Sequence, residues 1–215
     1  MPTLTMVRDR KQLHLILLLA CCLFVGCGRL KQWAYQGIGR DQWQQPEKVI
    51  ATLQIRPGDQ VADLGAGGGY FTFRLAQAVG PSGKVFAVDI DQQMIDLIDN
   101  QARKDGVANV ETVLAKADDP QLPKNGVDLI FTCDTYHHID NRVAYFRNLR
   151  TYLKTGGRLA VIDFDRRAWI EGLLRHYTPS EFLKREMEQA GFVLQVEHEF
   201  LDRQSFLIFA PDKAQ

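Results

Sequence analysis

The chain is poor in cysteine beyond its first residues and has no excess of either charge. Three of its 4 cysteines lie within residues 1–27, and only Cys133 lies in the body of the chain. A fold held by disulfides is therefore not expected, and the lack of Cys-x-x-Cys or histidine-rich spacing argues against a metal centre. The 26 basic and 26 acidic residues cancel to a net charge of zero. No overall field marks the protein for nucleic acid, which we do not expect as a partner.

Internal repeats and low-complexity segments are also missing, and strands alternate with helices in one α/β domain. We expect strands at 60–64, 84–89, 110–115, 127–133 and 158–164. We expect helices at 46–53, 70–79, 92–104, 142–153 and 178–190, the last opened by a capping box at 178–181. Two further strands at 192–201 and 205–210 have the spacing of a hairpin. Residues 116–126 are too few for a crossover helix, so we expect a loop there.

The sequence Asp-Leu-Gly-Ala-Gly-Gly-Gly at residues 63–69 directly follows the first strand. Glycine tolerates positive φ and has no Cβ, so this backbone can turn tightly and approach a ligand at the N-terminus of the next helix. A dinucleotide fingerprint requires glycine where Tyr70 stands, and a phosphate loop requires Gly-Lys-Ser/Thr. Asp63 would repel a phosphate and can accept hydrogen bonds from a cationic amino-acid group. The pattern favours a ligand that carries an ammonium and a ribose.

With Asp63, Gly65, Gly67 and Gly69, the chain resembles the class I S-adenosylmethionine-dependent methyltransferases, whose first motif reads Asp/Glu-x-Gly-x-Gly-x-Gly. The resemblance covers about residues 46–209. It implies a Rossmann-like three-layer α/β sandwich with a seven-stranded, mostly parallel sheet, in the order 3-2-1-4-5-7-6 with the last strand antiparallel. It also implies S-adenosylmethionine as the cofactor and methyl transfer as the reaction. An NAD-dependent oxidoreductase, the other nucleotide-binding reading, fails on the glycine spacing.

The resemblance also assigns roles to side chains that follow the strands. The cofactor-binding residues that it implies are Asp63, Gly65, Ala66, Gly67, Gly69, Asp89, Ile90 and Asp118. Asp89, at the end of the second strand, would accept both ribose hydroxyls, and Ile90 would lie against adenine. Asp118 would lie near the adenine amino group, although an ordinary turn acid is the alternative reading of this residue.

The fourth strand ends in Cys-Asp-Thr-Tyr-His-His at 133–138, where the methyl group and its acceptor are expected to meet. Asp134 is a candidate contact of the methionine ammonium. Tyr136 and His137 are candidates for orienting or deprotonating an acceptor, since imidazole titrates near neutrality. For His137, a role in packing or helix capping is as good an interpretation as a catalytic role. For His138, it is at least as good. Displacement at a sulfonium needs no protein nucleophile, so we interpret Cys133 as a core residue.

Further candidates for substrate contact follow the fifth strand, and they are Asp163, Trp169, His176 and Tyr177. The chain has no Asn-Pro-Pro-Tyr or Asp-Pro-Pro-Tyr motif, which counts against amino methylation of DNA bases or of protein glutamine. We expect a small-molecule acceptor, and a lipid or quinone-like compound near a membrane is the favoured class.

The N-terminus resembles a bacterial lipoprotein signal. Basic residues precede an apolar stretch at 13–25, which suits the core of a signal peptide and is short for a membrane span of about 20 residues. We predict a targeting segment at 1–27, a linker or lid at 28–45 and a methyltransferase domain at 46–215, with a lipidated Cys27 on the periplasmic face. Cleavage at Cys21, an uncleaved membrane anchor and a cytoplasmic protein stay open as alternatives.

The predicted cofactor conflicts with the predicted periplasmic location, because S-adenosylmethionine is made and kept in the cytoplasm. The alternative function is therefore an exported lipoprotein that keeps a methyltransferase-like fold and acts as a binding or scaffold protein. The intact set of Asp63, the loop glycines and Asp89 argues for a working cofactor site, since ligand contacts are free to change once the ligand is gone.

Overall fold

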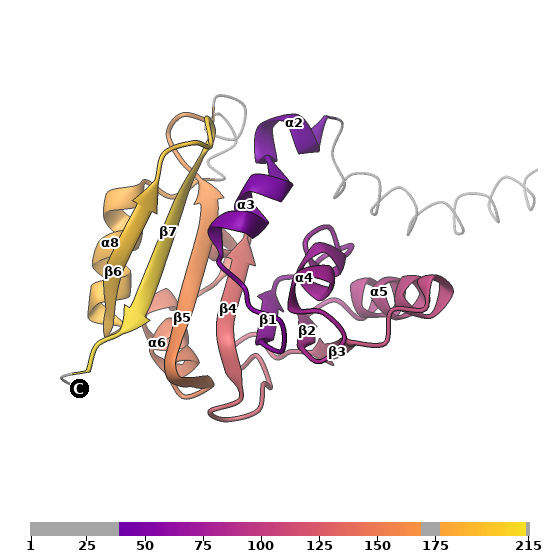
Figure 1. The fold of residues 1–215 in the computed structure, drawn as a ribbon. Coiled ribbons are helices and arrows are strands. Elements are labelled where there is room, and N and C mark those ends of the chain that lie inside the picture. Colours follow the sequence, from indigo (N-terminus) through magenta and orange to yellow (C-terminus); the bar gives the residue numbers. More distant parts are fainter. Residues whose placement is uncertain (1–38, 169–176, 214–215) are drawn as a thin grey trace, which may run out of the picture. The chain divides into compact units, whose positions relative to one another are not determined.

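A seven-stranded sheet organises the residues that the computed structural model describes, 39–168 and 177–213 (Figure 1). Its strands are β1 (Gln60–Leu64), β2 (Lys84–Asp89), β3 (Val110–Leu114), β4 (Val127–Cys133), β5 (Leu153–Phe164), β6 (Phe192–His198) and β7 (Gln204–Pro211). The spatial order is β3-β2-β1-β4-β5-β7-β6, and β7 runs antiparallel to both of its neighbours. The predicted fold class and strand order are confirmed.

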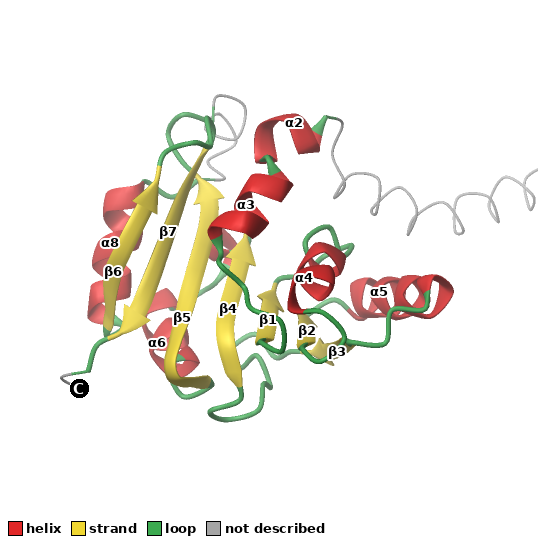
Figure 2. Ribbon diagram, in the orientation of Figure 1, coloured by secondary structure: helices red, strands yellow, loops and turns green. Residues whose placement is uncertain are grey.

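Helices cover both faces of the sheet (Figure 2). They are α2 (Arg40–Gln44), α3 (Pro46–Thr52), α4 (Thr72–Val79), α5 (Gln92–Asp105), the 3-10 turn η1 (Tyr136–His138), α6 (Arg142–Leu149) and α8 (Ser180–Gln189). Apolar side chains of α3 and α4 pack on one face, and those of α6 and α8 pack on the other. Successive side chains of a strand point to opposite faces of the sheet. Val61 therefore lies in the core between the sheet and helices α3 and α4, and Leu64 lies in the core between the sheet and helices α6 and α8.

The register brings the carboxyl ends of the central strands to one edge of the sheet. Leu64 pairs with Val88 on one side and with Thr132 on the other, and Cys133 pairs with Ile162. The strand order reverses between β1 and β4, which is where ligands bind in open α/β sheets. The residues that follow β1, β2, β4 and β5 therefore share one site.

Several predicted boundaries are wrong. The helix predicted at 70–79 begins at Thr72, and the strand predicted at 192–201 ends at His198. The helix predicted at 142–153 is α6, which ends at Leu149, and Leu153 already belongs to β5, where it pairs with Val127, so that strand begins before the predicted residue 158. Gly156 lies inside β5 with a φ of +81°, where the pairing between β4 and β5 shifts its register. The capping box at 178–181 does not form, because the cap residue of α8 is Pro179 and no side chain caps the helix. Thr178 is buried, and its N–H donates to the Phe164 carbonyl instead.

The predicted targeting segment at 1–27 lies outside the described residues, as does most of the segment at 28–45. At the end of that segment the structure places α2. In the part of the chain that is described, no helix has the length and apolar character needed to cross a bilayer.

Candidate cofactor and active site

The glycine loop, residues 65–69, is fixed against the end of β2. The N–H groups of Gly65 and Ala66 both donate to the Val88 carbonyl, over 2.8 and 3.0 Å. Gly65 has a φ of +77°, and a Cβ at this position would lie 2.0 Å from the Thr135 hydroxyl oxygen. The loop is therefore held close to the segment that follows β4, in a conformation that only glycine adopts without strain.

Asp89 connects the glycine loop with the turn that leads into α5. Its Oδ2 accepts from the Gly67 N–H over 2.8 Å, and its Oδ1 accepts from the Asp91 N–H over 2.9 Å. Each carboxylate oxygen has a second lone pair, so both can still accept from a ligand hydroxyl. The neighbouring Ile90 is 68 % exposed and offers an apolar surface beside the Asp89 carboxylate. This pair has the chemistry needed to hold a nucleoside.

Asp63 lies beneath the glycine loop. Its side chain is buried, and its Oδ2 accepts from the Thr72 hydroxyl over 2.6 Å, which ties β1 to the first residue of α4. Burial raises the pKa of Asp63 to about 7, the Thr72 hydrogen bond opposes this shift, and the nearby Asp89 adds to it. Asp63 thus supports the loop from below.

Asp134 belongs to a closed ring of four hydrogen-bonded side chains, which we call the Arg40 ring. Arg40 donates from Nε to Gln44 Oε1 over 3.0 Å and from Nη2 to Asp134 Oδ2 over 3.3 Å. Gln44 Nε2 donates to Gln204 Oε1 over 2.7 Å, and Gln204 Nε2 donates to Asp134 Oδ1. Burial raises the pKa of Asp134 to about 6, although Arg40 lowers it. The ring joins α2, the end of β4 and the start of β7.

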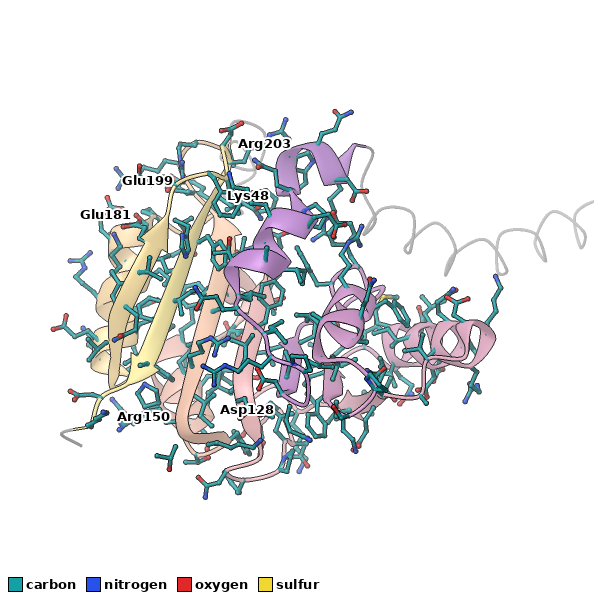
Figure 3. All side chains as sticks on the ribbon, in the orientation of Figure 1. Lys48, Asp128, Arg150, Glu181, Glu199 and Arg203 are labelled. Atoms are coloured by element: carbon teal, nitrogen blue, oxygen red, sulfur yellow. The ribbon has the colours of Figure 1, made fainter. Side chains whose placement is uncertain are left out.

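A second set of contacts fastens α2 to the end of the glycine loop. The Tyr70 hydroxyl donates to Asp41 over 2.6 Å, and Arg74 pairs with Asp41 over 3.4 Å. On the other side of α2, Trp43 packs on Phe164 with ring centroids 5.8 Å apart. Arg203, labelled in Figure 3, lies over the Trp43 ring at 5.4 Å. The helix therefore spans the site from α4 to β5.

His137 and Asp163 form a hydrogen-bonded pair at the ends of β4 and β5. His137 Nδ1 lies 2.7 Å from Asp163 Oδ1, the His137 side chain is 10 % exposed and Asp163 is fully buried. Asp163 Oδ2 is buried without a hydrogen-bond partner among the described residues. Burial lowers the pKa of His137, but the hydrogen bond and charge of Asp163, together with Asp134, outweigh it and raise the pKa above its usual range. Such a pair fixes the orientation of the imidazole ring and favours the tautomer that carries its hydrogen on Nδ1.

Comparison with known proteins identifies the family. A family model described as a methyltransferase domain matches residues 55–199. The chain belongs to this family. The match and the cofactor of the relatives below confirm the predicted enzyme class and S-adenosylmethionine as the cofactor.

The curated relatives include the ubiquinone/menaquinone biosynthesis C-methyltransferase UbiE of Ectopseudomonas mendocina, which is 33 % identical over 119 residues, or 55 % of this chain and 46 % of the relative. The UbiE protein of Francisella philomiragia is 31 % identical over 121 residues, 56 % of this chain and 48 % of the relative. The chain thus spans about half the length of the curated relatives that it matches.

Solved structures agree on the fold. A SAM-dependent methyltransferase from Aquifex aeolicus superposes with a TM-score of 0.78 and 26 % identity, over 83 % of this chain and 96 % of that one. A phosphoethanolamine N-methyltransferase of Haemonchus contortus, solved with S-adenosylhomocysteine, gives a TM-score of 0.64 at 16 % identity, over 80 % of this chain and 53 % of that one. The second likeness shows the fold alone.

The methyltransferase site brings together only part of the predicted set. Tyr136 lies apart from His137, because its ring is buried in the core beneath α6 and α8 and its hydroxyl donates to Glu186. Arg142 donates to the same Glu186 over 2.7 Å. Burial and the charge of Glu186 raise the pKa of Tyr136 well above its usual value, so the phenol stays protonated. The structure thus gives Tyr136 a packing role, and His138 is exposed.

Asp118 lies in an exposed turn after β3, closed by two backbone hydrogen bonds between Lys116 and Asp119. The adjacent Asp119 accepts from the Tyr152 hydroxyl over 2.6 Å and anchors the turn to the residue that precedes β5. The adenine contact of Asp118 stays a prediction. Tyr177 is half-buried beside α8, and the predicted substrate contacts Trp169 and His176 lie outside the described residues.

Sequence reasoning missed Arg40, Gln44 and Gln204, which close the ring around Asp134. It also read Asp163 as a substrate contact, whereas its carboxylate is the partner of His137. The adjacency of the fourth and fifth strands was the signal for that pair, because their ends are neighbours in this fold.

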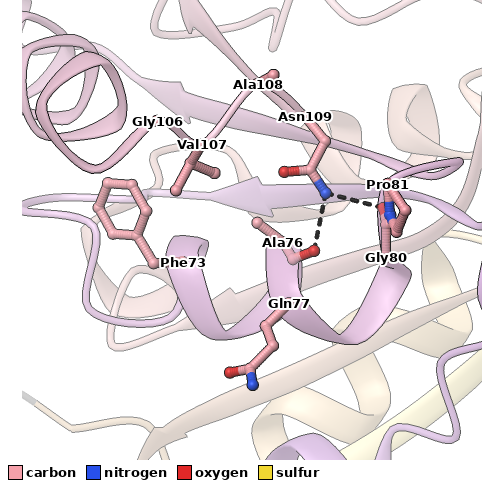
Figure 4. A pocket seen from close by; sticks show the side chains of 9 residues that line it. All are labelled: Phe73, Ala76, Gln77, Gly80, Pro81, Gly106, Val107, Ala108 and Asn109. Atoms are coloured by element: carbon pink, nitrogen blue, oxygen red, sulfur yellow. Dashed lines mark hydrogen bonds between the residues drawn. The ribbon is translucent and has the colours of Figure 1, made fainter.

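A separate pocket lies at the other end of α4 (Figure 4), lined by Phe73, Ala76, Gln77, Gly80, Pro81, Gly106, Val107, Ala108 and Asn109. The Asn109 amide donates to the carbonyls of Ala76 and Gly80 over 2.8 and 2.9 Å. These bonds satisfy carbonyls at the C-terminus of the helix, so the Asn109 amide has a structural role.

Proposed function

We propose that this protein transfers the methyl group of S-adenosylmethionine to a small-molecule acceptor that loses a proton in the reaction. The observation that supports this best is the His137–Asp163 pair, 2.7 Å apart at the carboxyl ends of β4 and β5. A base is needed at this place when the acceptor atom carries hydrogen, as a phenol oxygen or an activated ring carbon does. The UbiE relatives are named as C-methyltransferases of quinone biosynthesis, so a phenolic, quinol-like acceptor is the class that we favour.

The cofactor supplies the reactive methyl on a sulfonium, and the chain supplies binding, orientation and a base. The acceptor's electron pair forms the new bond to the methyl carbon, and the pair of the broken carbon–sulfur bond stays on sulfur. The acceptor proton passes to His137 Nε2, while Asp163 holds the Nδ1–H and balances the imidazolium charge. The glycine loop and Asp89 hold the nucleoside, so the reacting groups are positioned before reaction, which is the main source of rate in a direct displacement.

The cofactor site is tested by titration calorimetry with S-adenosylhomocysteine. We expect binding to the wild-type protein and its loss in Asp89→Ala, because the ribose loses its acceptor and Gly67 loses the group that fixes it. Asp96→Ala, on the exposed side of α5, is the matched control and should bind as the wild type does. A folded wild-type protein that does not bind S-adenosylhomocysteine would contradict the proposed enzyme and support the exported scaffold.

The base is tested with a panel of phenols and quinols, measuring formation of S-adenosylhomocysteine. We expect turnover of at least one phenolic acceptor, and we expect His137→Gln to lower kcat by about 10²-fold or more while cofactor affinity is kept. Equal turnover in His137→Gln would contradict the proposed base.

We also propose that the N-terminal segment attaches the protein to a membrane through a lipidated Cys27. The support is the sequence alone, a basic start followed by an apolar stretch and Gly26-Cys27. Palmitate labelling that disappears in Cys27→Ser would support the proposal, and labelling that persists there or never appears would contradict it.

A further inference from the structure

Two polar side-chain atoms are buried without a hydrogen-bond partner in the part of the chain that the structure describes, and they are Thr132 Oγ1 and Asp163 Oδ2. Both residues are fully buried. Buried polar groups of native proteins almost always have a partner, either a protein group or an ordered water. One of these two atoms belongs to a hydroxyl, which can donate, and the other belongs to a carboxylate, which accepts. The two groups therefore have complementary chemistry.

Thr132 and Asp163 also lie on the same face of two neighbouring strands. Thr132 pairs with Val161, so Asp163 is two residues further along β5. Val161 packs in the core beneath α6 and α8, and side chains alternate between the faces of a strand, so Thr132 and Asp163 both point to that side of the sheet. The spacing of strands and residues in a sheet places their Cα atoms roughly 8 Å apart. One water molecule between the two side chains can bridge such a separation.

Ser205 is a useful contrast, because it pairs with Asp163 from the opposite side, on β7. It is buried as well, and its hydroxyl donates to the backbone carbonyl of Asp163 over 3.5 Å. Of these two hydroxyls on the strands beside Asp163, the Ser205 hydroxyl has a partner of its own. The Thr132 hydroxyl is therefore the better candidate to serve Asp163 Oδ2.

We propose that one buried water links the Thr132 hydroxyl to Asp163 Oδ2, which makes Thr132 a positioning residue for His137. The water donates to Oδ2 and accepts from the Thr132 hydroxyl, while Oδ1 faces His137 Nδ1 over 2.7 Å. Buried waters characteristically bond to polar groups that would otherwise lack a partner. With both of its oxygens held, the carboxylate keeps its orientation toward the imidazole. This inference rests on the His137–Asp163 pair of the function proposed above.

The Thr132 hydroxyl acts on His137 through the charge of Asp163. Without the water, Asp163 Oδ2 loses its donor, and the buried charge depends more strongly on the imidazolium for compensation. The protonated form of His137 is then favoured, so its pKa rises. The other titratable or charged groups around His137 stay in place, and they are Asp134, Arg142 and His138.

The experiment is an NMR titration of the His137 imidazole in the wild type and in three variants, Thr132→Val, Thr132→Ser and Ser205→Ala. Valine keeps the shape of threonine and removes its hydroxyl, whereas serine keeps the hydroxyl. We expect the pKa of His137 to rise in Thr132→Val by about half a unit to one unit, which corresponds to the loss of one neutral hydrogen bond. It should keep its wild-type value in Thr132→Ser, which retains the donor, and in the matched control Ser205→Ala.

A His137 pKa that is unchanged or lower in Thr132→Val overturns the inference, and so does a shift that appears in Ser205→Ala instead. Failure of the His137–Asp163 pair itself gives a different result, because the pKa of His137 would then not respond to Asp163→Asn either. Should Thr132→Val fail a thermal-melt check of folding, a wild-type crystal structure that shows ordered water decides. We expect a water within hydrogen-bond distance of Thr132 Oγ1 and Asp163 Oδ2, and its absence there overturns the inference.

Discussion

Replacing Asp163 with asparagine removes one charge from the His137 pair and keeps the size of the side chain. In the wild type the two side chains meet over 2.7 Å, and the carboxylate is fully buried. A hydrogen bond to a charged partner contributes about 1.5–3 kcal/mol and a neutral one about 0.5–1.5 kcal/mol. The difference, roughly one pKa unit in free energy, predicts that the pKa of His137 falls by about one unit in Asp163→Asn.

The measurement is an NMR titration of the His137 imidazole in the wild type and in Asp163→Asn, which needs no acceptor. The spectrum also contains His198, which packs beside Phe206 at the far edge of the sheet, and its resonance is the internal control. Once an acceptor is found, the pH dependence of kcat gives the same information. The base acts in its neutral form, so the rate rises as the pH passes the pKa of His137. In Asp163→Asn this rise should come about one unit lower in pH, to a plateau reduced by on the order of tenfold.

Stability provides an independent check with a defined sign. The folded-state pKa of His137 is raised above its usual value, so the pair contributes stability that is full below the unfolded pKa of about 6.5 and is lost as the pH rises through the folded pKa. Asp163→Asn should therefore be more destabilised relative to wild type at pH 5.5 than at pH 8.5. An unchanged His137 titration in Asp163→Asn would refute the reasoning, because it would mean that the carboxylate does not act on the imidazole.

Three further substitutions test the local structure. Gly65→Ala should lower the free energy of unfolding by roughly 2–4 kcal/mol in thermal denaturation, because its Cβ would meet the Thr135 side chain in a left-handed conformation. Asp63→Asn should stabilise the protein at pH 8 by on the order of a few kcal/mol and have a much smaller effect at pH 4, because the wild-type pKa of about 7 means that stability falls as the pH rises from about 4 to 7. Tyr136→Phe should lower the free energy of unfolding by about 1 kcal/mol, because the hydrogen bond to Glu186 is lost, and it should leave kcat unchanged. A large fall in kcat would instead support a catalytic role for Tyr136.

The sequence was sufficient for the order of the strands in the sheet and for the position of the glycine loop. Strands in the middle of a parallel sheet have long apolar runs, as β4 does, and backbone geometry requires glycine in the loop. Both features can therefore be recognised in a single sequence. The end of α6 was not visible, because glycine both ends helices and permits irregularity in a strand. Leu153 was assigned to the helix for that reason, although its pairing with Val127 places it in β5.

The other half of the site depends on contacts between residues far apart in the chain. Arg40 meets Asp134 across 94 positions, and Gln44 meets Gln204 across 160. A five-residue helix such as α2 is too short to show the periodic pattern of apolar residues that would predict it. His137 and Asp163 were each identified as site candidates, but their pairing required the register between β4 and β5. Asp134 was predicted as a cofactor contact, and its enclosure by two neutral amides and a cation was not predictable.

The Arg40 ring also redefines where the domain starts. A fragment cut at residue 46 or at 55 would keep every strand of the sheet, yet it would remove Arg40, which is one partner of Asp134, and Gln44, which is one partner of the buried Gln204. Buried polar groups that lose their partners each cost about 1–3 kcal/mol, so such a fragment would carry a defect at the very edge where the strands end. The smallest fragment that keeps all of these hydrogen-bond partners therefore begins at or before Arg40, ahead of the residues that the family model matches.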